Sequence, residues 1–174
     1  PPAPPPEGAP AVGTLQKSPF FQARRLYFYF YDGRYKRLKD GVIDIHEQTD
    51  GSGLFEASFT LSSVAGTGRG GESYYTGNVL YSDMLIRFTF VNQFNPLEED
   101  LLYIFNPLEM RDYTDGLLCG ISSADLMPCA FRCLVTLAPQ PLDEDLRRRL
   151  LFSQKELRRW AKLNMLLIGN RGEG

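Results

Sequence analysis

The chain has 174 residues, of which 43% are hydrophobic and 13% aromatic, so it can bury the core of one domain and is not an intrinsically disordered chain. Its formal net charge of -2 at pH 7 excludes a nucleic-acid surface built on bulk positive charge, and we expect no direct nucleic-acid binding. No apolar run approaches the ~20 residues of a membrane-spanning helix, so we expect no membrane partner.

Residues 1–17 are rich in proline, alanine and glycine and contain little that could be buried. Such a composition favours extended polyproline conformations, so we predict a disordered Pro-rich linker. The sequence opens at Pro1 without a methionine. This opening is typical of an inter-domain linker, and we expect the domain to be part of a larger protein.

Eight segments with the composition or alternation of strands follow the linker. Residues 25–31 are aromatic and precede Asp32-Gly33, a strong hairpin-turn signal. Residues 54–63 alternate apolar and polar side chains, which predicts a strand with one buried face. The remaining strand segments are residues 41–48, 73–82, 84–94, 101–105, 116–122 and 128–138. No helix-length periodicity separates them, which favours antiparallel hairpins.

We therefore predict an all-β fold, an antiparallel eight-stranded up-and-down barrel over residues 18–140, because closure removes exposed strand edges. The alternation directs one set of side chains into the core: Phe55, Phe59, Ile86, Phe88 and Phe90. Residues 65–72 are rich in glycine but lack the lysine and hydroxyl residue of a P-loop. We expect a flexible hairpin connection there. The acids Glu98, Glu99 and Asp100 follow Asn95-Pro96 and are expected to be solvated turn residues.

Residues 141–170 are predicted to form C-terminal helices. Acidic residues precede the arginines at 147–149, which matches the helix dipole, and Ser153 with Glu156 forms a capping-box pattern. One face carries Leu157, Trp160, Ala161 and Ile168. We expect this face to pack on the barrel, on a partner domain or on a second copy in a homodimer.

The polar residues give no catalytic or metal-binding signature. The cysteines Cys119, Cys129 and Cys133 are odd in number, form no CxxC pair and lie far from the only histidine, His46. We expect free thiols, no metal, no cofactor and a reducing, cytoplasmic compartment. Asp44 could hydrogen-bond His46, but no nucleophile motif accompanies them, so we expect a surface histidine and no enzyme activity.

The aromatic side chains are the strongest functional signal. A closed eight-stranded barrel has room for packed side chains or for one small ligand. If the lumen is a ligand cup, its candidate lining is Phe28, Phe30, Tyr75, Tyr81, Phe88 and Tyr103, with Arg87 or Arg132 as partners for an anionic group. The arginines have the opposite parity from the apolar set. If the lumen is the polar face, the contacts become Tyr27, Tyr29, His46 and Arg87.

Eight strands followed by a terminal helix resemble the lipocalin or calycin architecture over residues 24–168. Residues 75–79, 85–88 and 116–122 are also similar to lipocalin-like sensor domains linked to bacterial regulators or effectors. This resemblance implies a small-molecule-sensing module of a larger intracellular protein, and we expect a nucleotide-like or aromatic ligand. The alternative is a protein-interaction or oligomerisation module with a barrel filled by side chains.

Overall fold

The computed structural model describes residues 18–65, 68–107, 110–121 and 127–162. In chain order the elements are α2 (Pro19–Gln22), β1 (Arg25–Asp32), β2 (Arg37–Glu47), β3 (Phe55–Ala65), β4 (Gly68–Tyr81), β5 (Leu85–Asn92), β6 (Glu99–Phe105), β7 (Tyr113–Ile121), β8 (Pro128–Thr136), α3 (Glu144–Leu150) and α4 (Gln154–Lys162). The predicted linker, residues 1–17, and the end of the predicted helical segment, residues 163–170, lie outside the described residues.

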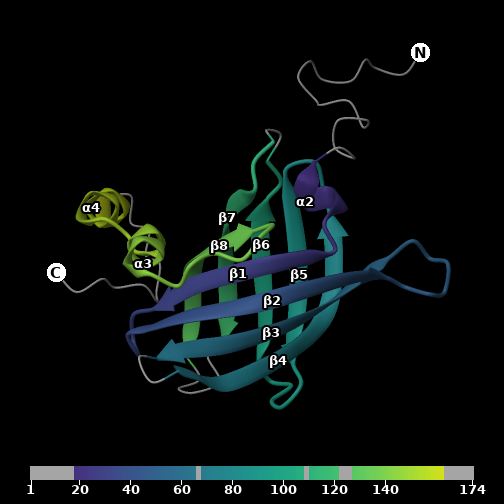
Figure 1. Ribbon diagram of the computed structural model, residues 1–174, viewed down its shortest axis with the longest axis horizontal. Helices are drawn as coiled ribbons and strands as arrows, with labels where there is room; N and C mark the ends of the chain where they lie inside the picture. The colour runs from purple at the N-terminus through teal and green to yellow at the C-terminus, as the bar shows by residue number, and fades with distance from the viewer. Residues whose placement is uncertain (1–17, 66–67, 108–109, 122–126, 163–174) are drawn as a thin grey trace.

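The eight strands form one closed barrel in which each strand pairs antiparallel with its sequence neighbours and β1 pairs with β8 (Figure 1). The predicted fold class is thus confirmed, and the architecture is the one that the lipocalin resemblance implies. No helix in the described part of the chain is long and apolar enough to cross a membrane.

The inward faces of the strands form an aromatic core. Phe28, Phe59, Phe88 and Phe90 are at most 1% exposed, and their rings are in contact. The ring centroids of Phe28 and Phe59 are 5.0 Å apart, and those of Phe88 and Phe90 are 5.5 Å apart. The predicted inward face is confirmed, with Phe55 partly buried at its edge. Side chains therefore fill the middle of the barrel.

Two inward-facing glycines let the strands approach this core. A Cβ atom on Gly41 would lie 2.6 Å from the Phe59 ring, and one on Gly77 would lie 1.5 Å from the carbonyl oxygen of Thr89. Any larger side chain at these positions would displace a ring or a backbone carbonyl. The glycines therefore let β2 and β4 coil closely around the aromatic core.

The strand β4 begins earlier than the sequence predicts. Residues 68–72 belong to β4, so the expected flexible connection over residues 65–72 is wrong for this part. The pairing of β3 with β4 shifts register between Ser62 and Ser63, and Gly71 is the unpaired residue of this bulge, with a φ of 62°. The bulge explains the error, because its glycine has the composition of a loop while the strand continues on both sides.

The strand β1 is packed on both of its faces. Phe28 and Phe30 point into the barrel, whereas Tyr29 and Tyr31 lie on the outside in a second core with Leu134 of β8. Leu146 and Leu150 of α3 complete that outer core. The unbroken aromatic run of β1 is explained by these two cores.

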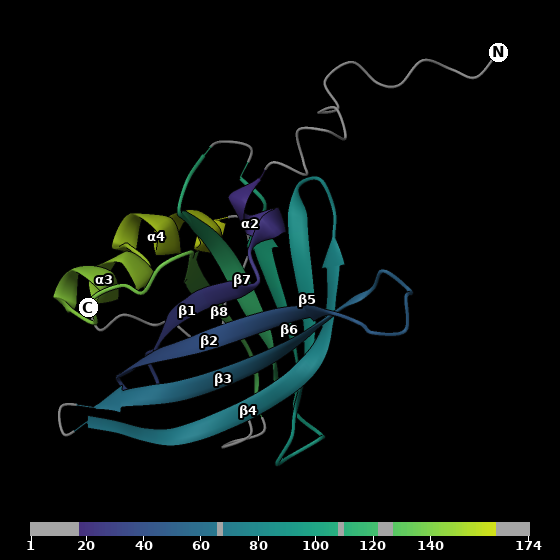
Figure 2. The same cartoon turned by 45° about the vertical axis from the view of Figure 1, so that its right-hand side comes forward.

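The terminal helices lie beside the barrel wall, while α2 lies over one end of the barrel (Figure 2). Asp143 caps α3 by accepting a hydrogen bond from the backbone N–H of Leu146 at 2.9 Å. The predicted capping box of α4 is present, because the Glu156 carboxylate accepts from the N–H of Ser153 at 2.8 Å. The side chains of Trp160 and Ala161, and all of Ile168, lie outside the described residues, so docking of that face stays a prediction.

The helix α2, which the sequence analysis did not predict, closes its end of the barrel. Phe20 is fully buried in the barrel core, and the Phe21 ring lies 4.9 Å from that of Tyr81. Ser18 donates a hydrogen bond to the side-chain oxygen of Asn106 in the loop between β6 and β7.

The three cysteines, Cys119, Cys129 and Cys133, form no disulfide with one another. Cys133 is fully buried in the barrel core. Burial raises the pKa of the Cys133 thiol well above its usual range, so this side chain acts as a small apolar residue.

The buried ring of Phe59 provides a test of the core. Phe59→Ala should lower the free energy of unfolding by about 3–5 kcal/mol, because it leaves a cavity among several rings. Leu54→Ala is the control, because Leu54 is 58% exposed and its truncation should change stability by less than about 0.5 kcal/mol. Urea denaturation measures both, and a loss below ~1 kcal/mol for Phe59→Ala would contradict the burial.

Candidate ligand-binding site

A cavity of about 90 Å³ lies at the end of the barrel opposite α2. It is lined by residues of β1, β3 and β7 near their ends and of β2, β6 and β8 near their beginnings. Tyr35 and Ile121 line it and are 47% and 37% exposed, so the cavity reaches the surface. Since one water molecule occupies ~30 Å³ in the liquid, this volume suits a few water molecules or a compact ligand.

Aromatic and aliphatic side chains form much of the cavity wall. They are Phe30, Phe59, Leu61, Leu118 and Phe131. The ring centroids of Phe30 and Phe131 are 4.7 Å apart, which fixes both rings against each other. These residues belong to β1, β3, β7 and β8, so the apolar wall surrounds the base of the cavity.

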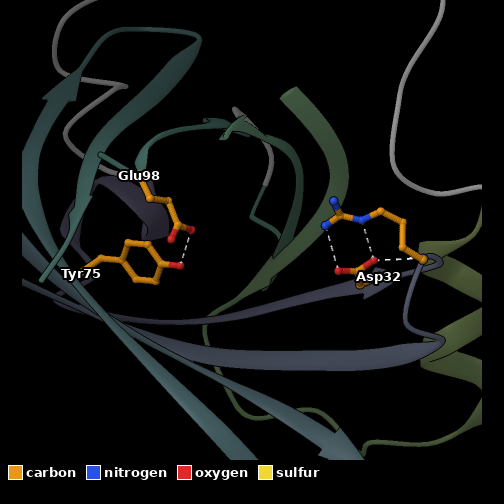
Figure 3. A network of polar contacts seen from close by, with 4 residues as sticks. Asp32, Tyr75 and Glu98 are labelled. Carbon is orange, nitrogen blue, oxygen red and sulfur yellow. Dashed lines mark hydrogen bonds and ion pairs between the residues drawn. The ribbon is translucent and has the colours of Figure 1, made fainter. Parts of the chain in front are cut away.

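The polar wall is formed by Tyr75 of β4, Glu98 in the loop before β6 and Asp100 of β6, and Asn92 of β5 supports it from behind. The Tyr75 hydroxyl donates to one oxygen of Glu98 at 2.8 Å (Figure 3). The side-chain amide of Asn92 donates to the other oxygen at 2.7 Å. Tyr75, Glu98 and Asn92 are all buried. Burial, together with the charge of Glu98, raises the pKa of Tyr75, so its hydroxyl remains a donor at physiological pH.

Asp100 is the second carboxyl group of this wall and is 9% exposed. Burial raises the pKa of Asp100 to about 7, and the charge of Glu98 and a hydrogen bond with it act in the same direction. Asp100 is therefore about half protonated near neutral pH. Gly120 makes room for it, since a Cβ atom at this position would lie 1.9 Å from one Asp100 carboxylate oxygen.

The other side of the cavity carries cationic side chains. Asp32 is 1% exposed and binds the Arg34 guanidinium through two contacts of 3.2 Å; Figure 3 shows Asp32 well apart from Tyr75 and Glu98. The Arg34 guanidinium lies 5.4 Å from the ring centroids of Tyr35 and Phe131. The cavity aromatics thus already contact a cation of the protein itself.

Lys39 completes this cationic side. Its ammonium lies 5.8 Å from the centroid of the Phe30 ring. Burial lowers the pKa of Lys39. The cavity therefore carries the acids Asp32, Glu98 and Asp100 and the bases Arg34 and Lys39, so it is acidic by about one charge when Asp100 is ionised.

The candidate lining residues from the sequence lie in four places: the cavity, the core, the α2 end of the barrel and the outer surface. Phe30 and Tyr75 line the cavity. Phe28 and Phe88 are fully buried in the core. Tyr81 lies at the α2 end, where its hydroxyl is buried with no hydrogen-bond partner among the described residues. The structure therefore brings only two of these aromatics to the cavity.

Tyr103 and the two candidate arginines lie on the outer surface. Arg87 and Tyr103 are cross-strand partners on the outward face of β5 and β6. Arg132 binds Glu156 of α4 at 2.7 Å and lies over the Phe152 ring. Since the lumen is the apolar face, the cations that line the cavity are Arg34 and Lys39.

The contacts expected for a polar lumen also lie outside. Tyr27 and Tyr29 belong to the outer core next to α3. His46 is an exposed residue whose Nε2 lies 3.6 Å from Glu56, whereas Asp44 binds Arg25 at 2.6 Å. The expected contact between Asp44 and His46 is therefore replaced by these two pairs.

The sequence analysis missed Asn92, Glu98 and Asp100. The expectation that Glu98 and Asp100 are solvated turn residues is wrong, because both are buried; of the three acids only Glu99 is exposed. The alternation of β6 indicates that Asp100 is buried, because Asp100 has the parity of the inward-facing Leu102 and Ile104.

Among the described residues, no group of three or more histidine, cysteine or acidic side chains could hold a metal ion. Comparison of the chain with models of protein families, with curated proteins and with solved structures gave no significant match. We therefore infer the function from the geometry of the cavity.

The raised pKa of Asp100 predicts a pH-dependent stability. The folded state binds this proton more tightly than the unfolded state, so the free energy of unfolding should fall as pH rises from about 4 to about 7 and then level off. Asp100→Asn should reduce that fall by on the order of 2–4 kcal/mol, since the amide has no charge to bury.

Urea denaturation across this pH range measures the effect, with Glu99→Gln as the matched control. Glu99 is the exposed neighbour of Asp100, so its variant should keep the pH dependence of the unaltered protein. An Asp100→Asn protein whose stability falls just as steeply between pH 4 and 7 would contradict the assignment.

Proposed function

We propose that this barrel binds a compact organic ammonium ligand in the cavity at its open end. The observation that carries the proposal is the pair of buried carboxyl groups, Glu98 and Asp100, in a cavity walled by aromatic rings. Carboxylates accept hydrogen bonds from an ammonium group, and rings attract a cation over their faces. An ammonium ligand can therefore interact with the carboxyl groups and with the aromatic rings at the same time.

The state of Asp100 gives such a ligand an electrostatic advantage. Burial, and then the nearby charge of Glu98, disfavour ionisation of Asp100, although Arg34 and Lys39 also line the cavity. An ammonium group supplies the missing counter-charge in a partly desolvated site, where charge pairs interact more strongly than in water. Binding should therefore release the proton of Asp100.

The size of the cavity limits the ligand. Pockets for drug-sized molecules occupy ~300–1,000 Å³, several times the 90 Å³ found in this cavity. A small amine therefore fits better than the nucleotide-like ligand expected from the sequence. The filled middle of the barrel also prevents deeper insertion, since Phe28 and Phe88 are fully buried there.

Calorimetric titration with n-butylammonium tests the proposal, with n-butanol as the uncharged analogue. The ammonium compound should bind and the alcohol should not. Glu98→Gln and Asp100→Asn should each weaken ammonium binding at least tenfold, which is about 1.4 kcal/mol. Glu99→Gln should leave binding unchanged, because this side chain is exposed. Equal binding of alcohol and ammonium would refute the proposal.

The affinity should depend on pH in a defined direction. Below the pKa of Asp100, binding requires loss of its proton, so affinity for n-butylammonium should rise by up to tenfold per pH unit between about pH 5 and 7. Above about pH 7 it should level off. Titration at pH 6 in buffers of different ionisation enthalpy should show proton release, and Asp100→Asn should abolish it. An affinity that stays constant from pH 5 to 8 is incompatible with this mechanism.

A further inference from the structure

Exposed apolar side chains lie on the loops and strand ends at the cavity end of the barrel. They are Tyr35 (47% exposed), Phe94 (80%), Leu97 (85%), Ile121 (37%) and Met127 (50%), and we call them the apolar collar. Tyr35 and Ile121 line the cavity itself. Phe94 and Leu97 lie in the loop that carries Glu98, and Met127 precedes Pro128, the cross-strand partner of Ile121.

The collar is larger than a compact ligand can cover. Phe94, Leu97 and Met127 do not line the cavity, so an amine bound inside leaves them in water. Contiguous apolar groups on a protein surface mark contacts with another molecule. A larger partner, which reaches from the collar into the cavity, would bury both.

Asn92 holds the loop that carries Phe94 and Leu97 in place, and it also positions the Glu98 carboxylate. The side-chain oxygen of Asn92 accepts from the N–H groups of Phe94 at 2.8 Å and Asn95 at 3.2 Å. Its amide nitrogen donates to Glu98 at 2.7 Å. The backbone N–H of Glu98 in turn donates to the carbonyl of Asn95 at 3.0 Å. The apolar tip and the acid are thus presented to a partner as one unit.

We propose that the open end is a docking surface for a polypeptide segment that inserts a lysine side chain into the cavity and covers the collar with apolar residues on either side. This inference rests on the proposed function and names its partner. The flexible alkyl stem of lysine suits the apolar wall formed by Phe30 and Phe131, and its compact ammonium suits Glu98 and Asp100. The acidic cavity at the centre of the collar disfavours an anionic membrane surface as the occupant.

Peptide-library selection on the full chain provides the first test. The probes are heptapeptides with randomised flanks and a fixed central residue, which is lysine, arginine, glutamine or norleucine in separate libraries. The lysine library should be enriched, with apolar residues selected next to the lysine. No enrichment over the norleucine library, or enrichment of arginine alone, would overturn the inference.

Fluorescence anisotropy with the selected lysine peptide then distinguishes the contribution of the apolar collar to binding from that of the cavity. Phe94→Ser with Leu97→Ser should weaken peptide binding at least tenfold while leaving n-butylammonium binding unchanged, whereas Asp100→Asn should weaken both. Met84→Ser with Phe105→Ser is the matched control, because these side chains are 67% and 57% exposed at the α2 end of the barrel. This control should bind the peptide normally.

The other outcomes are distinguishable. If n-butylammonium binds but the peptide binds no more tightly, the docking inference fails and the proposed function stands. If neither binds, both fail. Sedimentation with vesicles containing phosphatidylserine tests whether the apolar collar binds a membrane instead of a peptide. Binding to these vesicles that is lost with the collar variant but kept in Asp100→Asn would overturn the peptide partner in favour of a membrane.

Discussion

The volume of a closed eight-stranded barrel is the constraint on which the rest of this structure depends. Eight strands enclose a space that side chains can nearly fill, and here phenylalanine rings fill its middle. Phe20 of α2 packs into the core at one end, and the cavity lies at the opposite end. Its small size follows from the same packing, because Phe30 and Phe59 belong both to the core and to the cavity wall.

The polar wall shows how a barrel can hold charge at the edge of an apolar core. The two oxygens of Glu98 accept hydrogen bonds from Tyr75 and Asn92, which offsets the cost of removing the carboxylate from water. Asp100 lacks an equivalent pair of donors, and its raised pKa records the cost that remains. The difference between these neighbouring acids, one with both oxygens hydrogen-bonded and one with a raised pKa, supports the cation binding that we propose.

Most of the fold could be predicted from the sequence because period-two alternation and turn residues report directly on strands. All eight strands, the capping box at Ser153 and the inward face of Phe59 follow from such local patterns. The candidate site could not be predicted to the same extent. Tyr75 and Phe30, which share the parity of the core, line the cavity, but the position of the cavity depends on where the apolar filling ends along the barrel axis.

Local patterns also mislead where a residue type usually has another role. The proximity of Glu98 to Asn95-Pro96 is typical of a solvated turn, and only the tertiary contacts with Tyr75 and Asn92 show that it is buried. Gly71 resembles a loop residue for the same reason, although it forms a bulge inside a long hairpin. Arg34 binds Asp32 across a turn, a contact that depends on the fold of the hairpin and that residue spacing alone does not specify.

The two-sided packing of β1 has a consequence for the order in which the protein folds. The seam between β1 and β8 joins residues more than one hundred positions apart through only four residue pairs, Tyr27 with Thr136 to Phe30 with Cys133. Its closure carries the largest loop entropy of any strand pairing in the barrel. The helix α3 follows β8 in the chain and packs across this seam on Tyr29, Tyr31 and Leu134. Barrel closure and docking of α3 are therefore expected to form one late, cooperative step, in which α3 stabilises the pairing of β1 with β8.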